Sequence, residues 1–155
     1  MNGIGTKGKA KNLMKTITRF SEIMVKQKNV FPNGGNALDV EFVLVPMSAF
    51  LVSGFANDND VAFQMLPTYQ KKIMPYVNKE EYDEKTARFQ ELFTEYREKA
   101  IEVQENNEDW FWKFIYEFAD LTAKNMGSEN TDDAKKTIGA CIEELINTIN
   151  PKLNI

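Results

Sequence analysis

KEEYDEKTARFQELFTEYREKAIEVQE, residues 79–105, carries the longest regular pattern in this chain. Its apolar side chains recur every three or four residues, which is the period that places them on one face of an α-helix. Asn78 stands just before the pattern, where its side chain can accept a hydrogen bond from a free N–H group of the first turn. The stretch therefore predicts a long amphipathic helix with a buried face that contains Phe89, Leu92, Phe93, Tyr96, Ala100 and Val103.

Two more helices are predicted downstream. Residues 108–125 have helical periodicity and stop before Gly127, because glycine readily takes the left-handed conformation that closes a helix. Thr131 is a favourable first cap for the last helix, and the proline at position 151 ends it. The buried face of this last helix contains Ile138, Ile142, Leu145 and Ile149.

The segments upstream are less regular. Residues 9–27 have an amphipathic pattern with an apolar face, whereas residues 37–56 are almost continuously apolar, a pattern that fits either a strand or a buried helix. We favour a buried helical segment that is broken at Pro46, because proline disrupts the hydrogen bonding of a helix interior. For the same reason, Pro67 and Pro75 are expected to divide the next helical stretch into short pieces.

Together these patterns predict an all-α fold, a single-domain bundle of about five or six helices with one irregular apolar segment at 37–56. The helical domain is expected to span residues 9–150. Residues 1–8 are predicted to form a flexible N-terminal arm, and residues 151–155 a C-terminal tail.

The composition excludes much enzyme chemistry. The chain of 155 residues has no histidine and one cysteine, Cys141, so the usual zinc ligand and the Ser-His and Cys-His nucleophile pairs are missing. An internal disulfide is also excluded, and we expect a cytoplasmic protein without a membrane anchor. Frequent asparagine, lysine and isoleucine hint at an AT-rich genome, bacterial or phage.

Charge is distributed unevenly along the chain, whose net charge is −4. The first 29 residues contain seven basic side chains and one acid, Glu22. Lys11, Lys15, Arg19 and Lys26 are predicted to form a basic face on the first helix. Because phosphates attract such a face, nucleic-acid binding through the N-terminal helix is one alternative function, although the acidic remainder of the chain opposes it.

The long helix of residues 79–105 carries a row of carboxylates. Glu91, Glu95, Glu98, Glu102 and Glu105 step by four and three residues, so they share one helical face. We predict that this face either is merely solvated or binds a basic surface, which could belong to another protein, to a second copy of the chain or to the chain's own first helix.

The helix of residues 108–125 contains both tryptophans of the protein. Phe111, Phe114 and Phe118 supply a core-facing arc, while Trp112 and Tyr116 widen the apolar surface beyond one stripe. The helix is therefore either the buried centre of the bundle or a covering helix that offers Trp112 and Tyr116 to a partner.

Two acidic groups resemble the magnesium ligands of the all-α nucleoside triphosphate pyrophosphohydrolases, which carry E-E-x-x-E on one helix and E-x-x-D on a later one. They are Glu80-Glu81-Tyr82-Asp83-Glu84 and Glu117-Phe118-Ala119-Asp120. The resemblance implies that Glu81, Glu84, Glu117 and Asp120 bind Mg²⁺, with a metal-bound water as the nucleophile.

The sequence as a whole favours a non-catalytic, cofactor-free module for protein–protein interaction, such as an adaptor, an assembly factor or a phage-type inhibitor. Its contact surfaces would be the acidic face and the Trp112/Tyr116 flank. Its partner would be another protein with a basic surface, or a second copy of the chain. The magnesium-dependent hydrolase and the nucleic-acid binder are the alternative predictions.

Overall fold

The computed structural model of the chain describes residues 5–106 and 109–150, and every regular element within them is helical. This confirms the predicted all-α bundle of five or six helices. The elements are α1 (Thr6–Met24), α2 (Ala37–Phe55), α3 (Asn59–Ile73), the short 3-10 helix η1 (Met74–Tyr76), α4 (Lys79–Asn106), α5 (Trp110–Met126) and α6 (Asp132–Ile149).

Local capping explains where several helices begin and end. The side chain of Asn78 accepts a hydrogen bond from the backbone N–H of Glu81 at 2.9 Å, and that of Thr131 accepts one from Ala134 at 3.1 Å. Gly127 follows α5 with a φ of 66°, in the left-handed region that favours glycine. All three positions were predicted from the sequence, because such caps depend only on neighbouring residues.

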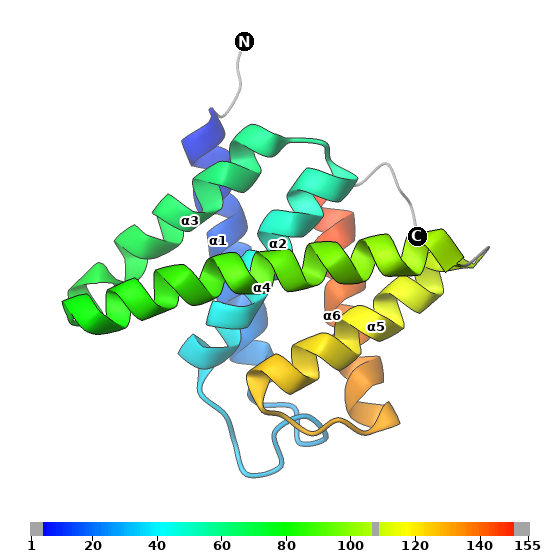
Figure 1. Cartoon of the computed structure of the whole chain (residues 1–155). Helices are drawn as coiled ribbons and strands as arrows, with labels where there is room; N and C mark the ends of the chain where they lie inside the picture. Colours follow the sequence, from blue (N-terminus) through cyan, green and yellow to red (C-terminus); the bar gives the residue numbers. More distant parts are fainter. Residues whose placement is uncertain (1–4, 107–108, 151–155) are drawn as a thin grey trace.

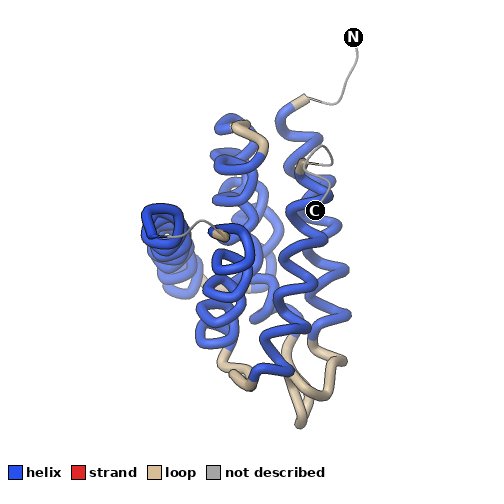
Figure 2. Tube along the Cα trace, turned by 90° about the vertical axis from the view of Figure 1, so that its right-hand side faces the viewer, coloured by secondary structure: helices blue, strands red, loops and turns tan. Residues whose placement is uncertain are grey.

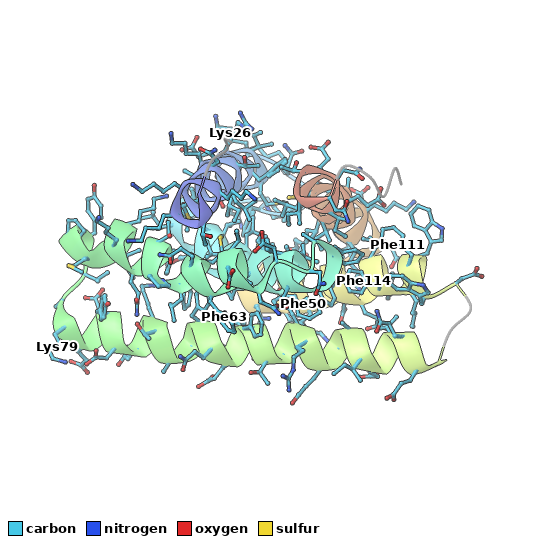
Figure 3. The ribbon with its side chains drawn as sticks, turned by 90° about the horizontal axis from the view of Figure 1, so that it is seen from above. Lys26, Phe50, Phe63, Lys79, Phe111 and Phe114 are labelled. Atoms are coloured by element: carbon cyan, nitrogen blue, oxygen red, sulfur yellow. The ribbon has the colours of Figure 1, made fainter. Side chains whose placement is uncertain are left out.

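The helices are stacked in three layers. Seen from above, α1 and α6 form one side, α2, α3 and α5 lie in the middle, and α4 forms the opposite side (Figure 3). The long α4 runs across the front of the other helices in Figure 1 and is seen almost along its axis in Figure 2. The two outer faces of the protein therefore belong to different helices with different charges.

The central helix is α2, which packs against α1, α3, α4, α5 and α6. It is one unbroken helix, so the predicted break at Pro46 is wrong, as is the strand alternative for this stretch. Proline removes one hydrogen bond and crowds the preceding turn, at a cost of about 3 kcal/mol. Burial of the side chains on both sides of Pro46, from Val43 to Ala49, offsets that cost.

By length and composition alone, α2 could also cross a membrane. Its apolar residues, however, are mostly buried by the other helices, and 61% of its most apolar window lies inside the protein. A membrane-spanning helix needs an apolar surface that faces lipid, whereas α2 has its apolar surface covered. The burial of α2 is that of a helix in the core of this bundle.

Other predicted boundaries shift as well. α3 continues through Pro67, so the predicted division there is wrong, and only Pro75 interrupts the helix, within η1. α1 begins at Thr6, so the last residues of the predicted arm are helical. The rest of the predicted arm, residues 1–4, and the predicted tail, residues 151–155, lie outside the described residues.

Candidate interaction surface

The Trp112/Tyr116 flank of α5 is exposed. Trp112 is 61% exposed and Tyr116 47%, although Phe114 and Phe118 on the opposite side of the same helix are almost completely buried. α5 is therefore a covering helix, not the buried centre of the bundle. Together with Lys136 and Ala140 of α6, the two exposed rings line a groove of about 580 Å³, which we call the aromatic groove.

Gly139 sets the depth of the aromatic groove. This residue is buried in the middle of α6, where glycine costs about 1 kcal/mol relative to alanine. A β-carbon at Gly139 would lie 3.1 Å from Cγ2 of Ile115, which is tighter than most such contacts. The glycine therefore lets α5 and α6 approach closely. The Trp112 and Tyr116 rings of α5 border the groove, and the small residues Gly139 and Ala140 of α6 line it between them.

Tyr116 is held in place by a charged neighbour. The Lys135 ammonium donates a hydrogen bond to the Tyr116 hydroxyl at 3.2 Å and lies 4.8 Å from the centre of its ring. Lys135 also forms an ion pair with Asp120 at 3.1 Å. These contacts to Tyr116 and Asp120 raise the pKa of Lys135. Tyr116 is consequently oriented before any partner binds.

The Asp120 carboxyl is stabilised in its charged form. Burial alone would raise its pKa, but hydrogen bonds from Lys124, Lys135 and Asn130 outweigh burial and lower it. A lowered pKa means that the contribution of Asp120 to stability is present above its ordinary pKa and is lost only as the pH falls through the lower value. The anchor of Tyr116 is therefore intact at neutral pH.

The acidic face of α4 is partly neutralised at its N-terminal end. One nitrogen of Arg88 lies 3.0 Å from the Glu91 carboxylate and 2.7 Å from that of Glu95. Its second terminal nitrogen donates to the side chain of Asn125 on α5 at 3.1 Å. Glu91 and Glu95 thus help to attach α4 to α5, a role that the sequence analysis did not predict.

The other half of the row is more open. Glu98, Glu102 and Glu105 are exposed, and Lys99 lies 3.4 Å from Glu102. Lys99 also lies 4.0 Å from Glu117 of α5. We call Glu98, Glu102 and Glu105 the acidic end of α4.

The acidic face does not bind the protein's own first helix, one of the predicted alternatives. α1 packs against α2, α3 and α6, and Figure 3 shows Lys26 on the α1 side and Lys79 on the α4 side of the molecule. The predicted basic face is exposed, although Lys26 lies beyond the end of α1 at Met24. Lys11 and Lys15 line a groove beside α3, together with Lys71 and Lys72, which the sequence analysis did not connect to them.

The structure does not bring the four predicted magnesium ligands together. Glu117 lies beside Lys99, and Glu84 is fifteen residues earlier on α4, a distance of roughly 22 Å along a helix. Glu117 also pairs with Lys113 at 2.9 Å, and Asp120 with Lys124 at 3.0 Å. Within residues 5–106 and 109–150, no group of three or more acidic or cysteine side chains is arranged to hold a metal.

The sole cysteine is not poised for nucleophilic chemistry. Cys141 is buried in α6, as expected for a small apolar residue, and burial followed by the nearby Glu144 charge raises its pKa to about 12. A reactive thiol instead has a lowered pKa.

Comparison with family models, curated proteins and solved structures gives no match for this chain. Its function must therefore be inferred from its own surfaces.

Proposed function

We propose that this protein is a non-catalytic module for protein–protein interaction and that the aromatic groove is its contact site. The exposure of Trp112 and Tyr116 on neighbouring turns of α5 carries the proposal. Burying a large apolar side chain stabilises a protein by about 1.5–3 kcal/mol, so a helix that only covered a core would gain little from placing these rings in water. Tryptophan and tyrosine are also the residues that most often dominate binding energies at interfaces.

The surroundings of the groove suggest the chemistry of the partner. Tyr116 is already oriented by Lys135, and Ala140 leaves space beside it for an inserted apolar side chain. Asp132 and Glu143 line the groove together with Lys135 and Lys136, but the charge of Lys135 is already paired with Asp120. We therefore propose a partner protein that inserts an apolar side chain flanked by basic residues. An adaptor, an assembly factor and a phage-type inhibitor, each in the cytoplasm, all fit this description.

The first test is affinity capture from a lysate of the organism that encodes the protein. A Trp112→Ala/Tyr116→Ala double variant should lose the captured partner, with an affinity at least roughly thirtyfold lower if the two rings contribute about 2 kcal/mol. The matched control is a Phe63→Ala/Tyr76→Ala variant, which removes two aromatic side chains that are 77% and 80% exposed elsewhere on the surface. Circular dichroism checks that both variants are folded.

Equal capture by the wild type and both variants would contradict the proposal. Capture of the partner by the wild type and by Trp112→Ala/Tyr116→Ala, but not by the control variant, would also contradict it. The contact would then involve α3 and η1.

The acidic end of α4 is tested separately. Glu98→Lys/Glu102→Lys should lower the affinity for a basic partner several-fold. It should also make the remaining binding less sensitive to salt, since exposed charges act mainly through screened attraction. Glu80→Lys/Glu84→Lys, near the start of the same helix, makes the same change in net charge far from the groove. The same loss in both variants would show that only net charge matters.

A further inference from the structure

A second groove, lined by lysines, lies between α1 and α3. Lys7, Lys11 and Lys15 of α1 line it together with Lys71 and Lys72 of α3. Its volume is about 470 Å³, and none of the described residues that line it is acidic. We call it the lysine groove.

Four of these lysines have no carboxylate partner in the part of the chain that the structure describes. Lys72 pairs with the buried Glu41 at 2.6 Å, but Lys7, Lys11, Lys15 and Lys71 form no ion pair with any of the described residues. On the other side of the protein, many basic side chains are paired with acids of α4 or α5, among them Arg88, Lys99, Lys113, Lys124 and Lys135. Most basic side chains without an ion pair among the described residues therefore lie within the first 28 residues of the chain, and three of them, with Lys71, line the lysine groove.

The row of lysines on α1 does not stabilise the helix that carries it. Lys7 and Lys9 lie in the first turn of α1, which contains no acidic residue, so their charges oppose the helix dipole. Lys7, Lys11 and Lys15 are four residues apart, and like charges at that spacing destabilise a helix by a few tenths of a kcal/mol per pair. A bound anion would remove both penalties.

The dimensions of the row suit a chain of phosphates. Lys7 to Lys15 spans eight residues, or roughly 12 Å along the helix. A nucleic-acid strand with stacked bases rises about 3.4 Å per nucleotide, so three or four of its phosphates lie over that length. The side-chain amide of Gln64 also lines the groove and can donate a hydrogen bond, whereas the Thr68 hydroxyl donates to the backbone carbonyl of Gln64 at 2.8 Å. Among residues 5–106 and 109–150, no aromatic or arginine side chain, which could stack on bases or read their edges, lines the groove.

We infer that the lysine groove binds the phosphodiester backbone of single-stranded nucleic acid without sequence preference. Lys7, Lys11, Lys15 and Lys71 contact phosphates, whereas Lys72 has a structural role. This inference does not depend on the proposed protein-binding function, because the aromatic groove is formed by other helices. No residue of α4 lines the groove among the described residues, and α1, which carries three of its lysines, lies on the other side of the molecule from α4 (Figure 3).

A membrane surface fits the groove less well. The apolar face of α1, including Leu13, Met14 and Ile17, is buried against the other helices, so Ile23 is the one large apolar side chain that the described part of α1 exposes to lipid. An acidic protein would match the positive charge of the lysine groove. A nucleic-acid strand matches it better, because its phosphates repeat at a regular spacing, as the ammonium groups of Lys7, Lys11 and Lys15 do.

The experiment measures anisotropy of a fluorescently labelled oligothymidylate of about 20 nucleotides. With four phosphate contacts, the affinity of the wild type should fall roughly fiftyfold between about 50 mM and about 200 mM salt. A Lys7→Gln/Lys11→Gln/Lys15→Gln variant retains one contact, so its affinity should be much lower at low salt and should fall only about threefold over the same range. None of these lysines is ion-paired, so the variant is expected to fold.

The control is Lys79→Gln/Arg97→Gln/Lys113→Gln, which makes the same change in net charge on α4 and α5 and should bind almost like the wild type. Undetectable wild-type binding at the lower salt concentration, or equal losses in the two variants, would overturn the inference. Tighter binding to polyglutamate or to phosphatidylserine vesicles than to the oligonucleotide would overturn it too, and would assign the groove to an acidic protein or to a membrane.

Discussion

Replacement of Phe118 by alanine is expected to lower the free energy of unfolding by about 3–5 kcal/mol. Phe118 is completely buried, and its ring centre lies 4.0 Å from that of Phe114 and 4.9 Å from that of Tyr96. It also contacts Phe50 of α2, with ring centres 5.9 Å apart. The side chain thus joins α2, α4 and α5, and its loss leaves a cavity that three packed helices cannot easily fill.

Urea denaturation followed by circular dichroism measures this loss. The matched control is Phe63→Ala, which removes the same ring from a position that is 77% exposed and should change the free energy of unfolding by less than about 0.5 kcal/mol. If Phe118→Ala does not fold, Phe118→Leu provides a milder version of the same test, with an expected loss of about 1 kcal/mol. Equal effects of Phe118→Ala and Phe63→Ala would contradict the packing described above.

Much of the helical pattern was predictable because its causes are local. Asn78, Thr131 and Gly127 cap the helices next to them, and the apolar spacing from Phe89 to Val103 depends only on the helical period. The continuity of α2 was not predictable in this way. The penalty of Pro46 is visible in the sequence, but the burial that offsets it comes from five other helices.

The candidate surfaces were predictable only in part. The spacing of Trp112 and Tyr116 identified an apolar surface wider than one stripe, but their exposure depends on where α6 packs beside α5. The lysine groove combines α1 with α3, which are separated by all of α2 in the sequence. Helical spacing could have suggested the Arg88 pairs with Glu91 and Glu95, because these residues lie three and seven positions apart.

Glu41 is an acid within the apolar stretch of α2, and the structure supplies the reason. Its side chain is almost completely buried, and the Lys72 ammonium lies 2.6 Å from its carboxylate. Lys72 also donates a hydrogen bond to the hydroxyl of Thr18 at 2.7 Å. The three side chains come from α2, α3 and α1, so this network fixes the position of the three helices relative to one another.

Lys72→Met should therefore be strongly destabilising. Removing one partner of a buried ion pair costs about 3–5 kcal/mol, because the other charge stays buried without compensation. The Lys72 side chain is 33% exposed, so the expected loss lies at the lower end of this range. Lys71→Met is the control, since the neighbouring lysine is exposed and unpaired among the described residues. Its free energy of unfolding should change by less than about 0.5 kcal/mol.

A double-mutant cycle separates the ion pair from packing. Glu41→Met/Lys72→Met removes both charges and retains apolar volume, so the double variant should be more stable than Lys72→Met alone, although it lacks one more native side chain. Additive losses measured by urea denaturation would show that the two charges do not interact. The expected non-additivity would instead identify Lys72 as a residue that the fold requires, which is why the charge variants of the lysine groove leave it unchanged.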